Sequence, residues 1–147
     1  MRTLGVLVGT AAALVAGTAV PGAASTEPPK EGPSIVYRQA DGSRIACPAG
    51  YMCLYTGPNF TGVMVRWPAG SADGDFTKIQ CPPQYCTNGD FNDDASSWHN
   101  NNTGHKYCIS EHVGGGGWDN STPNNTSGNL TGRYNNTASA LSYLGCP

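Results

Sequence analysis

Residues Phe91–Trp98 read FNDDASSW, and the chain repeats this pattern as YNNTASAL at Tyr134–Leu141. Both copies have an aromatic residue, Asn, a second Asn or Asp, a variable residue, Ala, Ser and, two positions later, a large apolar residue. Such a match indicates an internal repeat, which determines the architecture before any single strand is considered. The chain is therefore expected to contain two related units.

A second pattern also occurs twice, each time upstream of the first. Residues Tyr55–Gly62 read YTGPNFTG, and residues Tyr107–Gly114 read YCISEHVG. Each copy has an aromatic residue, a second ring five positions later and Gly two positions after that, which is typical of a folded hairpin in which Gly adopts a positive φ. The following Val63–Trp67 (VMVRW) alternates, with its two Val residues and Trp on one face, as a half-buried strand requires.

The two patterns recur in the same order, so the sequence predicts an all-β fold in which two Greek-key units pack as a sandwich. Asn92 follows Tyr55 by 37 positions, whereas Asn135 follows Tyr107 by 28. The first unit therefore carries nine extra residues (37 − 28), and CPPQYC at Cys81–Cys86 lies in that interval. We expect an excursion from the common scaffold, closed by a disulfide.

The composition agrees with short strands joined by turns. The 147 residues include 20 Gly and 11 Pro, which disfavours a helical bundle and a large α/β enzyme. At 38% hydrophobic and 12% charged residues, the chain is too apolar for a disordered tail. Its net charge is −2 and its Lys and Arg residues are scattered, so no nucleic acid is expected as a partner.

The N-terminus has the organisation of an export signal. Arg2 precedes an uncharged run of mainly Leu, Val and Ala at Thr3–Val20, and the small residues that follow offer a cleavage site near Ala24 or Ser25. The run is shorter than the roughly 20 apolar residues that span a bilayer, so no stable membrane anchor is expected. The sequence predicts a signal peptide over residues 1–25 and a secreted, extracellular protein.

Residues 26–44 follow as a Pro-rich leader that is expected to be flexible, although Ser34–Arg38 could add an edge strand. The compact domain is expected over residues 45–147, with Greek keys at about 45–103 and 104–147. The run from Gly114 to Gly128 is polar and rich in Gly, which predicts a mobile loop. Its Trp118 is either a contact residue or a cover on the core.

Six cysteines in an exported chain predict three disulfides, chosen from 15 possible pairings. Such cross-links compensate for limited burial in a domain of about 100 residues. Proximity in the sequence favours Cys47 with Cys53, Cys81 with Cys86, and Cys108 with Cys146.

The repeated units resemble the βγ-crystallin superfamily, whose Greek keys carry an aromatic hairpin and then a calcium motif of two Asn or Asp, two variable residues, Ser or Thr, and Ser. Asn92–Ser97 fits this motif in full, whereas Asn135–Ala140 ends in Ala instead of Ser. More narrowly, CPAGYMCLY at Cys47–Tyr55, running into Gly57–Gly62, is similar to the opening of the secreted actinobacterial peptidase-inhibitor family of the streptomycete metalloproteinase inhibitor type. That family is βγ-crystallin-like, and its first characterised members inhibit thermolysin-type metallopeptidases.

The resemblance implies calcium sites that each take ligands from both keys, with the variable positions acting through carbonyl oxygens. Few carboxylates predict weak binding, on the order of 10⁻⁵ to 10⁻³ M, and Ala140 weakens the second site. The alternative is that these side chains only hydrogen-bond their turns. No other cofactor is expected. The candidate ligand residues are Asp93, Asp94, Ser96, Asn136, Thr137 and Ser139.

The resemblance also implies tight binding to a secreted peptidase, with a metallopeptidase as the expected target and a monomer as the expected state. An inhibitor needs an exposed segment held rigidly in an extended shape. The loop within CPPQYC meets this need, and its candidate contact residues are Pro82, Pro83, Gln84 and Tyr85, with Tyr85 as the anchor. The alternative is that the disulfide only ties down an insertion, and an inhibitory surface elsewhere is equally allowed.

The sequence contains no recognisable constellation for catalysis, so no enzyme activity is expected. Asp90, Asp93 and Asp94 lie within five residues of one another and fit solvated loop residues or calcium ligands better than a glycosidase pair. His99 and His105 lie in Asn-rich sequence without a recognisable nucleophile. The rival function is a calcium-binding structural or interaction module without inhibitory activity.

Overall fold

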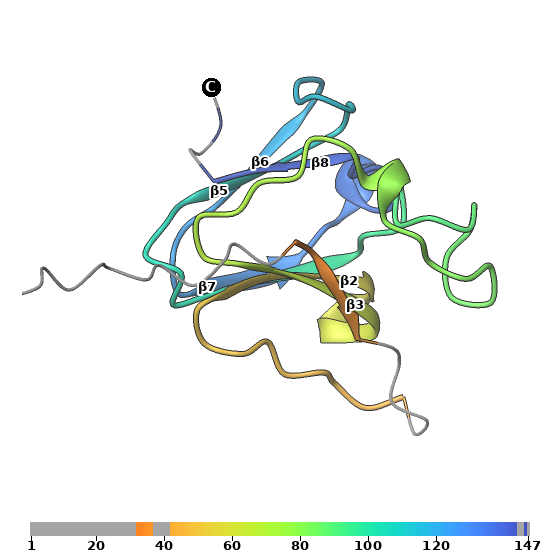
Figure 1. The fold of residues 1–147 in the computed structure, drawn as a ribbon, viewed down its shortest axis with the longest axis horizontal. Helices are drawn as coiled ribbons and strands as arrows, with labels where there is room; N and C mark the ends of the chain where they lie inside the picture. Colours follow the sequence, from red (N-terminus) through yellow and green to blue (C-terminus); the bar gives the residue numbers. More distant parts are fainter. Residues whose placement is uncertain (1–31, 37–41, 144–145, 147) are drawn as a thin grey trace, which may run out of the picture.

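The computed structural model describes residues 32–36, 42–143 and 146. The predicted signal peptide at residues 1–25 lies outside the described residues, as does the leader up to residue 31. Figure 1 shows two layers of strands facing each other. The helical segments of the described residues are single 3₁₀ turns: η1 (Pro58–Phe60), η2 (Phe76–Lys78) and η3 (Gly132–Tyr134).

The strands in the described part of the chain form two antiparallel sheets, here called sheet A and sheet B. Sheet A has the order β1 (Ser34–Val36), β3 (Thr61–Pro68), β2 (Tyr51–Gly57), β4 (Ser97–Asn101) and β7 (Thr126–Asn129). Sheet B has the order β6 (Asp119–Thr122), β5 (Tyr107–Ser110) and β8 (Ala140–Ser142).

Each unit contributes one segment to the sheet of the other. Strand β7, from the second unit, pairs with β4 at one edge of sheet A. In return, Asp73 of the first unit forms an isolated bridge with Leu141 of β8: the Asp73 N–H donates to the Leu141 carbonyl at 2.9 Å, and the Leu141 N–H donates back at 2.6 Å. This exchange produces two interlocked Greek keys, so the all-β sandwich predicted from the repeat is confirmed.

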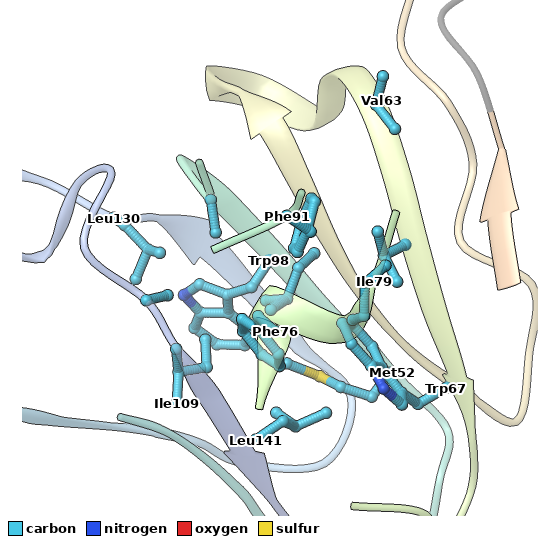
Figure 2. Close-up of a cluster of buried hydrophobic side chains, with 14 of the residues drawn as sticks. Met52, Val63, Trp67, Phe76, Ile79, Phe91, Trp98, Ile109, Leu130 and Leu141 are labelled. Carbon is cyan, nitrogen blue, oxygen red and sulfur yellow. The ribbon is translucent and has the colours of Figure 1, made fainter. Parts of the chain in front are cut away.

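The main core lies between the two sheets and contains side chains from both (Figure 2). Val63, Val65 and Trp67 point into it, as the alternation in β3 predicts. Trp67 stacks on Phe76 with ring centroids 5.4 Å apart, and Phe76 contacts Phe91 at 5.8 Å. Phe76 and Phe91 flank the segment that contains the predicted excursion at Cys81–Cys86. Burial of their rings provides the main driving force for holding the two ends of this segment on the sandwich.

The outer face of sheet A has a second, smaller cluster of buried side chains. Its members are Ile45, Cys47, Cys53, Tyr55 and Met64. The segment before β2 therefore lies across this face, where the Ile45 N–H donates to the Phe60 carbonyl at 2.8 Å. Since sheet A is covered on both sides, β2 is buried at four consecutive positions instead of alternating.

The hairpin pattern is displaced by three residues in the second unit, which corrects the predicted equivalence of Tyr55 with Tyr107. Tyr55 pairs with Ser97, whereas Ser110 pairs with Ala140. Ser97 and Ala140 are equivalent in the FNDDASSW repeat, so Ser110 is the counterpart of Tyr55. Tyr107 instead occupies the position of Met52, and both side chains are fully buried.

The prediction of a mobile loop needs correction, whereas the edge strand that the leader could add is confirmed at Ser34–Val36. The expected mobile loop from Gly114 to Gly128 contains β6 and nearly all of β7, and Trp118 is a buried core residue with 6% exposure. In the leader, β1 pairs with β3 at the edge of sheet A. Strand β7 has polar side chains and no apolar alternation, so its sequence does not predict a strand. Its backbone pairing with β4 places it in the sheet.

All six cysteines pair as proximity in the sequence predicts. The bridges are Cys47–Cys53, Cys81–Cys86 and Cys108–Cys146, with sequence separations of 6, 5 and 38 residues. The third joins β5 to the chain just beyond β8, so the end of the chain is fixed to the centre of sheet B.

Candidate functional site

The excursion of the first unit ends in a compact turn closed by the Cys81–Cys86 bridge. The Pro82 carbonyl accepts from the Tyr85 N–H at 2.8 Å and from the Cys86 N–H at 3.1 Å. This is the hydrogen-bonding pattern of one helical turn. The extended conformation predicted for the loop is therefore wrong, although the predicted rigidity has a clear physical basis.

The base of this turn is fixed by main-chain pairing. The Cys81 N–H donates to the Gly89 carbonyl at 3.0 Å, Gln80 forms a bridge with Asp90, and the Phe91 N–H donates to the Ile79 carbonyl at 3.0 Å. The two half-cystines are buried, whereas Pro83, Gln84 and Tyr85 are exposed. Figure 1 shows the segment projecting from the body of the sandwich.

Asp94 fastens the turn from the other side. Its two carboxylate oxygens accept from the N–H and the hydroxyl of Thr87, at 2.8 Å and 2.7 Å respectively. Thr87 directly follows Cys86, and Asp94 is buried with 8% exposure. The side chain of Asp94, a residue of the predicted calcium motif, is therefore engaged with the excursion.

The two motif loops lie against each other with approximate two-fold symmetry. Asp93 and Asn136 occupy equivalent positions and both have a left-handed conformation, with φ of 61° and 57°. The Asp93 N–H donates to the Ala138 carbonyl at 3.0 Å, and the Asn136 N–H donates to the Ala95 carbonyl at 2.9 Å. The structure thus brings the predicted residues of the two keys together.

One hollow beside these loops has an acidic lining, and we call it the Asp93 hollow. It has a volume of about 430 Å³. Glu111 was not among the residues predicted from the sequence, because it comes from the β5–β6 hairpin and not from the motif. The lining residues are Asn92, Asp93, Glu111, His112, Val113, Asn136, Thr137 and Ser139.

The surroundings of Asp93 disfavour its charged form. Partial burial raises the pKa of its carboxyl group, and the nearby negative charges of Asp94, Asp90 and Glu111 raise it further. The Ser139 hydroxyl, 3.4 Å from Asp93 Oδ1, acts in the opposite direction but does not outweigh burial. A divalent cation in this hollow would relieve the repulsion among the carboxylates, so the donor set fits calcium.

The symmetry-related position on the other side has different chemistry. There the Ser96 hydroxyl donates to Asn136 Oδ1 at 2.8 Å. No carboxylate is present in the lining of the adjacent hollow, which consists of Pro58, Ser96, Asn129, Leu130, Thr131, Gly132 and Asn135. This second position therefore fits a cation less well.

The histidines considered in the sequence are not placed with a nucleophile. His99 lies in β4 beside Phe60, and burial lowers the pKa of its imidazole. His105 packs edge-on against Tyr143 with ring centroids 5.7 Å apart. Among the described residues, one group could bring three metal-binding atoms together, namely Cys108, Asp119 and Cys146, but its two sulfurs form a disulfide.

Comparison with known proteins decides the family. The sequence model of peptidase inhibitor family I36 matches residues 40–119, more than half of the chain. The chain belongs to peptidase inhibitor family I36. The matched residues of this I36 inhibitor include the turn at Cys81–Cys86 and the first motif loop. The family is one of peptidase inhibitors and not of enzymes.

The fold of the I36 inhibitor is that of a βγ-crystallin domain. A solved structure described as "Evolution of the eye lens beta-gamma-crystallin domain fold" superimposes with a TM-score of 0.51 and 20% sequence identity, over 75% of this chain and 94% of that chain. No curated protein sequence matches the chain. In the part of the chain that the structure describes, no helix has the length and apolar character needed to cross a membrane.

Proposed function

We propose that this I36 inhibitor is secreted and blocks a metallopeptidase by tight binding of the rigid turn at residues 81–86. The observation that carries the proposal is the exposed turn itself, which is closed by a buried disulfide and fixed by hydrogen bonds at both ends. A segment that is already ordered loses little conformational freedom on binding, so more of its contact energy appears as affinity.

Tyr85 is the proposed anchor of the inhibitory surface. It is 39% exposed, and it is one of two large hydrophobic residues that lie exposed among the described residues. Aromatic side chains that enter a pocket of the partner typically dominate an interface, whereas their neighbours mainly exclude water. Pro83 and Gln84 would then form the rim of the contact.

The first experiment is a titration of the purified mature protein into a thermolysin-like metallopeptidase and, separately, into a subtilisin-like peptidase. We expect stoichiometric loss of the metallopeptidase activity, with one inhibitor bound per enzyme. Loss of only the subtilisin-like activity would overturn the target class and leave inhibition standing. Unchanged activity of both enzymes would contradict the proposal.

Variants then test whether the turn is the inhibitory surface. Replacing residues 82–85 by Gly and Ser, with both cysteines kept, should weaken inhibition by about 100-fold or more because the anchor is lost. The control is the same replacement in the exposed turn at residues 123–125, between β6 and β7. Equal potency of the two variants would place the inhibitory surface elsewhere.

Export is tested separately from inhibition. If residues 1–25 are a signal peptide, the protein recovered from the culture medium should begin near Ser25 or Thr26 when its mass is measured. Recovery of the full-length chain only inside the cells would contradict this part of the proposal.

We also propose one weak calcium site, in the Asp93 hollow, as a second property of the domain. It is supported by the presence of Asp93, Glu111 and Ser139 in the lining of one hollow and by the raised pKa of Asp93. Calcium at millimolar concentration should raise the melting temperature of the intact protein, and this increase should disappear in Asp93→Ala. Asp75→Ala is the matched variant, because it removes a carboxylate that does not line the hollow, and it should retain the increase. A melting temperature that calcium leaves unchanged in the intact protein would exclude the site.

A further inference from the structure

We propose that Asp94 is a positioning residue for inhibition, whose carboxylate fixes the closed turn in one orientation on the sandwich. The inference rests on the proposed function, since it assigns a role to a residue beside the same inhibitory surface. It concerns the side chain of Asp94, whereas the calcium motif would use the carbonyl oxygen at this variable position. The same residue can therefore serve both purposes.

The contact between Asp94 and Thr87 has the properties of a strong latch. Both carboxylate oxygens are used, and both donors belong to one residue: the Thr87 N–H at 2.8 Å and its hydroxyl at 2.7 Å. Hydrogen bonds to a carboxylate are shorter and stronger than bonds between neutral groups. Asp94 is buried and holds its carboxylate in a fixed place, whereas Thr87, which supplies both donors, lies at the surface.

The other bonds of the excursion do not fix its orientation in the same way. The pairing of Cys81 with Gly89 and of Gln80 with Asp90 joins the two arms of the excursion to each other, and the disulfide closes the turn on itself. Asp94 belongs instead to the motif loop, in which Asp93 is bonded across to Ala138 of the second key. The latch therefore connects the turn to the junction of the two keys.

The second key shows what this position does where there is no excursion. Its equivalent residue, Thr137, donates to the Arg133 carbonyl at 2.7 Å and accepts from the Trp118 indole N–H at 3.0 Å. A short hydroxyl side chain is sufficient there because its partners lie close by. In both keys this position fastens a neighbouring segment, and in the first key the longer carboxylate reaches the segment that follows the inhibitory turn.

Three variants separate positioning from general stability. Asp94→Asn keeps the shape of the side chain but replaces one acceptor by an NH₂ group, and Thr87→Val removes the hydroxyl donor. Thr87→Ser keeps that donor and should restore wild-type behaviour. The control is Thr122→Val, which removes the buried bond from the Thr122 hydroxyl to the Tyr107 carbonyl in sheet B, remote in sequence from the turn. All measurements are made with excess calcium and again with a chelator.

The first readout is amide hydrogen exchange at Thr87, whose N–H donates to Asp94 Oδ2 and so reports the latch itself. In Asp94→Asn and Thr87→Val, exchange at this amide should be about tenfold faster than in the control variant, in line with the loss of one hydrogen bond to a charged group. The second readout is the inhibition constant, which should increase by at least about tenfold in the same two variants and not in Thr87→Ser.

The two readouts fail independently. If the intact protein inhibits no peptidase, the proposed function falls, and the exchange rates alone decide whether Asp94 holds the turn. Unchanged exchange at Thr87 would overturn the latch whatever the inhibition shows. Faster exchange with an unchanged inhibition constant would show that Asp94 orders the turn without positioning it for inhibition, which also overturns the inference.

Discussion

At the scale of single residues, Tyr55 and Tyr107 are two buried tyrosines whose hydroxyl groups differ in their hydrogen bonding. Both side chains are fully buried, and burial raises the pKa of each phenol, that of Tyr55 to about 12. The Tyr107 hydroxyl accepts from the Gly70 N–H at 3.0 Å. The Tyr55 hydroxyl has no hydrogen-bond partner among the described residues. A buried polar group without a partner costs free energy that a hydrogen-bonded one does not.

Replacing each tyrosine by phenylalanine should therefore have opposite effects. Tyr55→Phe removes an unsatisfied hydroxyl and should increase the free energy of unfolding by up to about 1 kcal/mol, whereas Tyr107→Phe leaves the Gly70 N–H without its acceptor and should decrease it by about 1 kcal/mol or more. Urea unfolding of the two variants measures both values. A loss of stability in Tyr55→Phe comparable to that in Tyr107→Phe would show that the Tyr55 hydroxyl has a partner, such as a buried water molecule.

In the calcium-free protein, the titration of Asp93 should lower the free energy of unfolding as the pH increases. Its pKa is raised in the folded state, so the folded protein binds this proton more tightly than the unfolded chain does. The resulting stability is present below the unfolded pKa of about 4 and is lost as the pH rises through the higher folded value. Asp93→Asn removes this titration and should keep the left-handed backbone conformation, which Asn tolerates well.

The measurement is the melting temperature in chelator between about pH 3 and pH 7. The intact protein should lose stability relative to Asp93→Asn over this range, and saturating calcium should reverse the difference. A constant difference between the two proteins at every pH would mean that Asp93 does not titrate as its surroundings indicate.

At the scale of the elements, the β2–β3 hairpin depends on Gly62. Its φ is 82°, and a Cβ atom there would collide with the hydroxyl of Thr56 and lie 2.9 Å from the Gly57 nitrogen. Gly104 has a similar φ of 75°, but a Cβ atom added there would have no neighbour within 4 Å. The two glycines therefore separate the cost of the backbone conformation from the cost of the close approach.

We expect Gly104→Ala to lower the free energy of unfolding by about 1 kcal/mol, which is the penalty for an L-residue with positive φ. Gly62→Ala should lower it by about 3 kcal/mol, because the collision within the hairpin is added. Chemical denaturation of both variants gives the comparison. Equal losses would mean that the hairpin moves to accommodate the methyl group.

The sequence predicts elements well where a pattern reflects packing and poorly where it does not. The FNDDASSW repeat is correctly aligned, since its Ala and Ser residues face the same environment in both keys. The hairpin repeat is misaligned by three residues, because Tyr107 matches the spacing but lies at the position of Met52 in the strand. Strands β6 and β7 were missed since their side chains are polar and their pairing comes from the backbone.

The candidate site could be predicted in part for similar reasons. The motif residues lie together because each belongs to a repeated turn, whereas Glu111 reaches the Asp93 hollow from a hairpin that has no such signature. The turn at residues 81–86 was expected from its two cysteines, but its compact conformation depends on the Pro82 carbonyl, which sequence spacing does not report. The latch from Asp94 to Thr87 is likewise visible only in three dimensions.

At the scale of the whole molecule, the exchange of segments between the sheets makes the two keys interdependent. Sheet A includes β7 of the second unit, and sheet B is bridged by Asp73 of the first. We therefore expect one cooperative unfolding transition, in which tryptophan fluorescence and far-UV circular dichroism coincide. Residues 104–147 alone should be unfolded, because β7 would have no neighbour.

A substitution in one sheet should then destabilise both. Leu141→Ala, in sheet B, removes a buried side chain with 2% exposure and should cost about 2–5 kcal/mol. Hydrogen exchange at Val65 in sheet A and at Ile109 in sheet B should report the same loss. A loss confined to Ile109 would show that the keys unfold separately.

The order of the disulfides has a consequence for how the protein is made. Counted along the chain, the first cysteine is joined to the second, the third to the fourth and the fifth to the sixth. The three bridges therefore form three separate loops that neither overlap nor enclose one another. An oxidase that meets the chain from its N-terminus would join the cysteines in native pairs as they emerge. Such a chain has no non-native bridge to undo, and its maturation needs an oxidant but no disulfide isomerase.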